Sequence, residues 1–327
     1  MNSNDSSSSS SDHNMSLEEQ HHHSSFFINN DHIHFIREVN RSKFPIYLVH
    51  DTKTNQYKAL KLFPWNAQQT QPSSFFLKEI KFSKIRHPNI ISITNFQVEQ
   101  YVSSSRPSKV SYTLMDYARH GDMFDALKTK EIPFSDALAR SYFQQIVAGV
   151  EALHAYGAAH LDLKLENILL DQDFQAKIAD FDMSFVSGDR KVVSRGTSNY
   201  RPPEIIRGVC QDPQAADVYS LGIIMFLLKA NGILPFAEGV LCAGVNMKEL
   251  LENNPELFWK KHYEFTGINE LLTDEDFKTL FLGMTHKDPA RRMTIKDVKA
   301  SKWWNKEIVP KEKIFSYMSE KFYPFSS

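Results

Sequence analysis

The 327-residue chain has little cysteine, no long apolar run and no excess of charge of either sign. A chain of this length can bury most of its apolar surface without covalent cross-links, so its two cysteines, Cys210 and Cys242, need not form a disulfide. No apolar run approaches the ~18 residues that indicate a membrane span, and no charged segment followed by an apolar one stands at the start. We therefore expect neither secretion nor membrane insertion, and we expect a reducing compartment, the cytoplasm or the nucleus.

The charge balance argues against a nucleic-acid-binding protein. The chain carries 38 basic and 39 acidic side chains, for a formal net charge of -1. Nucleic-acid-binding domains usually show a strong basic excess or a basic stripe, and here composition gives no sign of either. What the chain does contain, 42% hydrophobic and 12% aromatic residues, is typical of a globular protein with one large domain or two ordinary ones.

Residues 1–30 form a Ser-, His- and Asn-rich segment that includes six consecutive serines. It has almost nothing to bury, so the sequence predicts a disordered tail. His21, His22 and His23 could bind a metal, but adjacent histidines in a serine-rich tract are more often low-complexity sequence, and we assign them no role.

The pattern of apolar residues changes along the rest of the chain. Alternation and β-branched residues over 35–63 predict strands joined by a polar turn at 51–55, and further strands are predicted over 90–96 and 110–117. A helical stretch is predicted around 74–85. After Gly121, apolar residues recur at intervals of three and four, which predicts helices, and the apolar run 218–228 suits a helix buried in a large core. A small sheet-rich lobe therefore precedes a larger helical one.

The residues most typical of catalysis lie in two nearby segments. The first reads His160-Leu-Asp-Leu-Lys-Leu-Glu-Asn167, and the second is Asp180-Phe-Asp182. Phosphoryl transfer needs oxygen ligands for metal ions, a carboxylate that orients the attacking hydroxyl, and fixed cations on the phosphates. These needs are met by Asp180, Asn167, Asp162 and Lys164.

These segments resemble the catalytic and metal-binding loops of the protein kinases, whose motifs are H-R-D-L-x-x-x-N and D-F-G. From about residue 35 to residue 304 the chain carries the family's other motifs in the family's order. They are the strand that ends at Lys61, Glu79 on the next helix, His87-Pro-Asn-Ile90, Gly196-Thr-Ser-Asn-Tyr-Arg-Pro-Pro-Glu204, Asp217-Val-Tyr-Ser-Leu-Gly222 and Arg292, which matches the arginine that pairs with the glutamate at 204.

The resemblance implies a bilobal α+β fold. The N-lobe, residues 31–117, would be sheet-rich with one main helix, the larger C-lobe, residues 118–305, would be mostly helical, and residues 306–327 would form a C-terminal tail. It also implies a transferase, a serine/threonine-protein kinase that uses ATP and Mg²⁺ on protein substrates. We expect it to be monomeric and cytoplasmic, or nuclear.

The resemblance assigns the catalytic roles as follows. Lys61 holds the α and β phosphates and is positioned by an ion pair with Glu79. Asp162 orients the substrate hydroxyl, and Lys164 faces the γ phosphate. Its position two residues after Asp162, together with Thr197, is typical of serine/threonine specificity. Mg²⁺ is held by Asn167 and Asp180.

The nucleotide pocket follows from the same resemblance. Met115 matches the residue at the back of the adenine site, Ala118 offers backbone hydrogen bonds to adenine, and Asp122 meets the ribose or a basic residue of the substrate. The remaining wall is formed by Ile46, Ala59 and Leu169.

The nucleotide-covering loop departs from the family. The expected G-x-G-x-x-G is replaced by residues 38–46, which contain no glycine, so Val39, Arg41 and Phe44 stand where the family has bare backbone. Side chains of residues 41–43 could replace the lost amide contacts, or the segment could be a solvated turn. We expect weak ATP binding.

Three further departures concern regulation and geometry. Leu161 replaces the arginine that normally meets a phosphate on the activation loop, and Val193, at the usual phosphorylation position, has no hydroxyl, although Ser194 is its neighbour. We therefore expect a kinase that does not need activation-loop phosphorylation. Asp182 replaces a glycine and could add a metal ligand, raise nearby pKa values or stiffen the loop. Glu79 lies one residue closer to His87 than is usual, so its orientation is open.

Two functions fit these observations, an active kinase and a kinase-like scaffold that transfers no phosphate. Scaffolds of this kind often lack one of the key ionic residues, whereas Lys61, Asp162, Asn167 and Asp180 are all present, which favours the enzyme. The C-terminal Phe322-Tyr-Pro-Phe325-Ser326 resembles a motif with which one kinase group clamps its small lobe, but it could equally be a frayed end.

Overall fold

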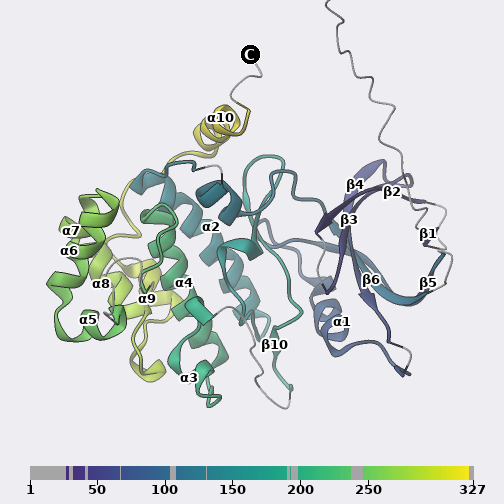
Figure 1. The fold of residues 1–327 in the computed structure, drawn as a ribbon, viewed down its shortest axis with the longest axis horizontal. Helices are drawn as coiled ribbons and strands as arrows, with labels where there is room; N and C mark the ends of the chain where they lie inside the picture. The colour runs from purple at the N-terminus through teal and green to yellow at the C-terminus, as the bar shows by residue number, and fades with distance from the viewer. Residues whose placement is uncertain are drawn as a thin grey trace, which may run out of the picture.

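The computed structural model describes residues 27–28, 32–40, 43–66, 68–103, 108–129, 131–189, 192, 198–236 and 246–323. They form two lobes, a sheet-rich one with a single main helix and a larger helical one (Figure 1). The predicted α+β, bilobal fold is confirmed. None of the helices in the described ranges is both long and apolar enough to cross a membrane.

The N-lobe is built on one antiparallel sheet. Its strand order is β1-β5-β6-β4-β3-β2, from β1 (Phe27–Ile28), β2 (Ile33–Asn40), β3 (Ile46–Asp51), β4 (Gln56–Pro64), β5 (Ile93–Ser103) and β6 (Ser108–Asp116). Strand β1 lies within the segment predicted as a disordered tail, residues 1–30, and its residues Phe27 and Ile28 pair with the end of β5.

Alternation along β4 gives its two faces different roles. Leu60 and Leu62 are buried in an apolar cluster on one face of the sheet. Ala59 and Lys61 therefore point to the opposite face. The strand lies between β3 and β6, with Ala59 opposite both Leu48 and Met115.

The predicted helix over 74–85 is two elements. Helix α1 (Ser74–Glu79) is capped by Ser73, whose hydroxyl accepts the Phe76 amide at 3.2 Å, and it continues as a 3₁₀ turn over Ile80–Lys84. A 3₁₀ helix rises about 2.0 Å per residue and an α-helix about 1.5 Å. The five residues of the turn therefore span about 10 Å, which compensates for the missing residue between Glu79 and His87.

The C-lobe is centred on two packed helices, α2 (Asp136–Ala155) and α4 (Pro213–Lys229), as the apolar patterns over 137–153 and 218–228 predicted. Every residue from Ala216 to Lys229 is buried. The other elements are α3 (Pro203–Ile206), α5 (Met247–Asn253), α6 (Pro255–Thr266), α7 (Glu270–Thr273), α8 (Glu275–Met284), α9 (Ile295–Ala300), β7 (Ala158–Ala159), β8 (Ile168–Leu170), β9 (Ala176–Ile178) and β10 (Phe185–Val186).

A further helix, α10 (Lys311–Phe322), lies on the outside of the C-lobe (Figure 1). Sequence analysis predicted only a tail from residue 306 onward. Instead, Ile314 and Met318 of α10 are fully buried against the lobe. Phe322 contacts His120 of the C-lobe. Residues 324–327, which include the second phenylalanine of the predicted clamp, lie outside the described residues.

Candidate active site

Lys61 lies among three carboxylates. Its Nζ is 2.5 Å from Glu79 Oε2, 2.7 Å from Asp180 Oδ1 and 3.5 Å from Asp182 Oδ2. Burial would lower the pKa of Lys61, but the carboxylates outweigh that effect and raise its pKa, so the ammonium is charged. Thr113 donates a 2.8 Å hydrogen bond to the other oxygen of Glu79. The ion pair implied by the resemblance therefore forms despite the short spacing before His87.

The catalytic-loop residues also converge. The Asn167 side-chain amide donates to the Asp162 carbonyl oxygen at 2.8 Å and to Asp162 Oδ2 at 3.1 Å, and Lys164 Nζ lies 2.9 Å from the same Oδ2. These contacts fix the Asp162 carboxylate from two sides.

Asp217, near the start of helix α4, holds the loop that carries His160 and Leu161 in place. Its carboxylate accepts the backbone amides of His160 at 2.8 Å and of Leu161 at 2.9 Å, and it is completely buried. Leu161 adopts a left-handed conformation with φ 63°. Such a backbone costs energy in a non-glycine residue, and the two hydrogen bonds to Asp217 help to hold it.

Asp180 also has a left-handed backbone, with φ 67°. Phe181 is buried behind it, stacked on Phe82 with ring centroids 4.6 Å apart and tilted against His160 at 5.4 Å. Burial opposes ionisation of Asp180, but Lys61 holds the pKa of its carboxyl below the usual range.

Asp182 stands where the family has a glycine. Its own backbone conformation is ordinary, because its φ is not positive. Its carboxylate is mostly buried, and burial raises its pKa, with the negative charge of Asp180 adding to the effect. Of the three effects considered from the sequence, a raised pKa is therefore found for Asp182 itself, mainly through burial, whereas the pKa of the neighbouring Asp180 is lowered.

Asn167 and Asp180 have the donors that a magnesium ion prefers. The Asn167 amide nitrogen is committed to Asp162, which leaves its Oδ1 as a ligand, and Asp180 keeps one carboxylate oxygen beyond the one bound by Lys61. Among the described residues no cluster of three or more His, Cys, Asp or Glu could hold a metal. A magnesium ion here would thus depend on these two residues together with nucleotide oxygens, its usual manner of binding.

Ala59 pairs with Met115 across β4 and β6, and the other residues assigned to the walls of the adenine pocket are part of the same core or pack against it. Ala59, Met115 and Ala118 belong to the main apolar core, and Ile46 and Leu169 pack against it. Asp122 is joined to Leu169 by a backbone bridge, and its side chain accepts the Asp125 amide at 2.8 Å. Burial raises the pKa of Asp122.

The glycine-free loop is fastened to the lobe by Phe44. The Phe44 ring centroid lies 4.8 Å from that of Phe63 and 5.2 Å from that of Phe75 at the start of α1. Lys61 Nζ is 5.8 Å from the Phe44 centroid, and Lys43 Nζ is 4.2 Å from the Phe75 centroid. No motif or apolar pattern in the sequence predicts this anchor. Residues 43–45, which connect to β3, are thus not a fully solvated turn, while residues 41 and 42 lie outside the described residues.

Leu161 packs where the family has a cation. It forms an apolar cluster with Ala159, Ile205 and Ala216, against which Phe185, Val192 and Cys210 pack. Val193, Ser194 and Thr197 lie outside the described residues. The predicted ion pair between Arg292 and Glu204 forms, with Arg292 Nη1 2.6 Å from Glu204 Oε1.

Comparison with known proteins agrees with this arrangement. A model of the protein kinase domain matches residues 44–304. The chain is 30% identical over 227 residues to "CBL-interacting protein kinase 26" of Oryza sativa subsp. japonica. The match covers 68% of this chain and 41% of that protein, so the chain matches less than half of the relative's length.

Proposed function

The chain belongs to the protein kinase family, and from this we propose that it transfers the γ-phosphate of ATP to serine or threonine hydroxyls of proteins, with magnesium. The proposal depends on one observation, the pairing of the catalytic cations with the catalytic acids. Lys61 lies 2.7 Å from Asp180, and Lys164 lies 2.9 Å from Asp162. The name of the rice relative supports kinase activity.

In this proposal the charged residues divide the work. Asp162 accepts a hydrogen bond from the substrate hydroxyl and aligns it for in-line attack. Lys61 and Lys164 neutralise phosphate oxygens, and both already lie beside carboxylates that fix them. Asn167 and Asp180 would hold magnesium, which supplies positive charge to the β and γ phosphates when it is bound.

We further propose that the active arrangement does not depend on activation-loop phosphorylation. The Leu161 cluster supports this, because it supplies apolar packing where the family has a cation for a phosphate. We expect a monomer that acts on protein substrates in the cytoplasm or the nucleus.

A kinase-like scaffold is the second candidate. The Phe44 ring lies 5.8 Å from the ammonium of Lys61, the residue assigned to the phosphates, and no glycine lets the loop backbone approach. This favours weak nucleotide binding, but it leaves the set of ionic residues intact.

The test is transfer of radiolabelled phosphate from ATP to a mixed protein substrate. Asp180→Ala should abolish incorporation, because it removes a metal ligand and a partner of Lys61. Asp173→Ala, an exposed acid in a turn of the same lobe, is the matched control and should keep wild-type activity. Equal incorporation by the wild type and Asp180→Ala would favour the scaffold.

A further inference from the structure

The chain beyond Trp304 runs along α2 before it forms α10. The Ser141 hydroxyl accepts the Val309 amide at 2.8 Å, and the Gln144 side chain donates to the Trp304 carbonyl at 2.9 Å. Tyr317 of α10 donates a 2.6 Å hydrogen bond to the Pro133 carbonyl. The C-terminal segment is therefore fixed to the C-lobe along its described length.

The end of α10 meets a buried histidine. The ring of His120 stacks on that of Phe174 with centroids 3.8 Å apart and an interplanar angle of 7°, and Phe322 and Tyr323 meet it edge-on. The Tyr323 hydroxyl is 3.1 Å from His120 Nδ1, and His120 Nε2 is 3.3 Å from the Gln172 carbonyl oxygen.

These contacts define the protonation of His120. A carbonyl oxygen only accepts hydrogen bonds, so Nε2 carries the proton that faces Gln172. Burial lowers the pKa of His120, which favours the neutral ring, and Nδ1 is then an acceptor. The Tyr323 hydroxyl therefore donates to His120.

His120 lies in the segment that follows β6, between Ala118 and Asp122. The His120 amide donates to the Leu170 carbonyl at 3.1 Å, and the Leu170 amide donates to the Gly121 carbonyl at 2.8 Å. Ala118 and Asp122, two residues to either side, are the residues proposed to meet adenine and ribose. A contact that holds His120 thus acts on a segment that is proposed to bind the nucleotide.

We propose that Tyr323 is a positioning residue for nucleotide binding, which acts by holding residues 118–122 through His120. The proposal rests on the proposed kinase function. Tyr323 also lines a groove of about 750 Å³ together with Tyr117 and Arg119, which come just before His120 in the chain.

The test compares Tyr323→Phe with Tyr317→Phe in the full chain. Each variant removes one hydroxyl from the C-terminal segment, but only Tyr323 bonds to His120, whereas Tyr317 bonds to Pro133. Backbone hydrogen exchange of peptides covering 116–123, without nucleotide, reports whether the segment is held. The dissociation constant of ATP, with kcat at saturating ATP, reports the consequence.

Tyr323→Phe should speed exchange in 116–123 and raise the dissociation constant of ATP about threefold to tenfold, with kcat unchanged. The change in the free energy of ATP binding cannot exceed the free energy of the lost hydrogen bond. The variant alters ATP affinity only by shifting the equilibrium between the held and the freed forms of residues 118–122. Tyr317→Phe should change neither quantity.

The two failures are distinguishable. Unchanged exchange in Tyr323→Phe, or equal effects of the two variants, would overturn the positioning role whatever the protein binds. Faster exchange in a protein whose wild type transfers no phosphate and binds no ATP would leave the holding contact intact, but it would overturn the link to nucleotide and the kinase function itself.

Discussion

His262 is a buried histidine outside the proposed active site. Its ring contacts those of Phe226 and Phe258, with centroids 4.7 Å and 4.6 Å away. Nε2 donates to the Pro235 carbonyl at 3.1 Å, and Nδ1 has no hydrogen-bond partner among the described residues. Burial lowers the pKa of His262 from 6.5 to about 4.

This pKa predicts a loss of stability in acid. Because the folded-state pKa lies below the unfolded value, the unfolded chain binds the proton more tightly, and stability falls as pH drops from 6.5 toward 4. We expect His262 to account for about 2 kcal/mol of the free energy of unfolding lost between pH 7 and pH 5.

Urea unfolding at pH 7 and at pH 5 measures this loss of stability. His262→Leu should lose less stability on acidification than the wild type, and His34→Leu, at an exposed position, should behave like the wild type. An identical pH dependence in His262→Leu would contradict the assignment.

Leu161 carries the prediction on regulation. Since it packs in an apolar cluster, phosphatase treatment and Ser194→Ala should leave the transfer rate nearly unchanged. Leu161→Arg should lower the rate at least tenfold, because it places a charged side chain in the apolar cluster of Ala159, Ile205 and Ala216. A tenfold loss, about 1.4 kcal/mol in barrier, after phosphatase or Ser194→Ala would show that a phosphate is required.

At the residue scale, the resemblance to kinase motifs singled out Lys61, Asp162, Asn167 and Asp180. The structure pairs Lys61 with Asp180 and Asp162 with Asn167, and the Ala179 amide next to Asp180 donates to the Asn167 carbonyl at 2.9 Å. Spacing could not identify His120, because its hydroxyl partner is 203 positions away in the chain. Such a pair depends on the packing of α10, for which no local pattern was recognised.

Phe44 shows how the nucleotide-covering loop is held at the level of elements. It joins the turn before β3 to Phe63 on β4 and to Phe75 on α1, so the loop is attached to the helix that carries Glu79. The family's loop instead offers glycine amides to the phosphates.

We predict that Phe44→Gly tightens ATP binding about tenfold. It removes a ring beside Lys61 and lets the backbone approach a charged oxygen, a contact of about 1.5 kcal/mol. Phe35→Ala is the matched control, because Phe35 is a half-buried aromatic of the same hairpin that packs on Tyr47. Weaker binding by Phe44→Gly in a nucleotide titration would mean that the aromatic anchor itself holds the loop in its binding position.

Most elements were predictable because they alternate or repeat with a helical period. Two of those that were missed lack such a local signal. β1 has only Phe27 and Ile28 and exists by pairing with β5, and the 3₁₀ turn at 80–84 shares its composition with a helix. α10 is amphipathic, but its position after the last family motif led us to predict a tail.

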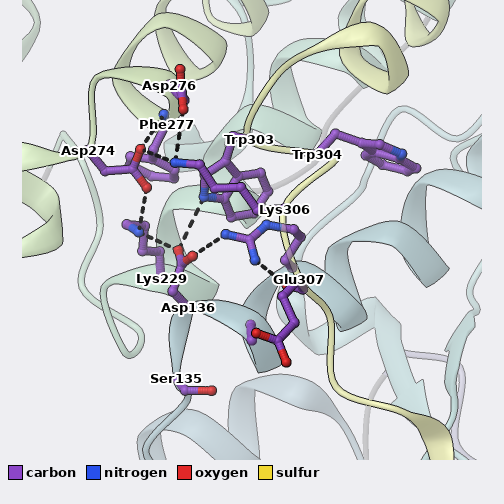
Figure 2. A network of polar contacts seen from close by, with 12 residues as sticks. Ser135, Asp136, Lys229, Asp274, Asp276, Phe277, Trp303, Trp304, Lys306 and Glu307 are labelled. Carbon is purple, nitrogen blue, oxygen red and sulfur yellow. Dashed lines mark hydrogen bonds and ion pairs between the residues drawn. The ribbon is translucent and has the colours of Figure 1, made fainter.

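At the scale of the whole molecule, a buried ionic network ties the C-terminal segment to the C-lobe core (Figure 2). Asp136 at the start of α2 accepts from Arg140, from Lys229 on α4 and from the indole of Trp303, the last at 3.2 Å. Arg140 also donates to the Glu307 carbonyl. The Asp136 carboxylate is thus shared by three separate parts of the chain.

We predict that Asp136→Asn lowers the free energy of unfolding by about 3 kcal/mol, because it leaves two buried cations short of a partner. Lys229 keeps Asp274 at 3.3 Å, which limits the loss. Asp276→Asn, which removes a more exposed partner of Lys306, should cost less than about 1 kcal/mol. Equal losses in the two variants, measured by denaturant unfolding, would show that the network adds no more than a surface pair.

The central claim is that this kinase-family chain transfers phosphate through Asp162. The most direct measurement is transfer from radiolabelled ATP by the wild type and by Asp162→Asn, with ATP affinity measured in parallel. The substitution keeps the shape of the side chain and removes the charge that orients the hydroxyl, so transfer should fall at least about a hundredfold while ATP affinity stays within about twofold. Transfer by the wild type no faster than by Asp162→Asn would contradict the claim and leave a scaffold as the better account.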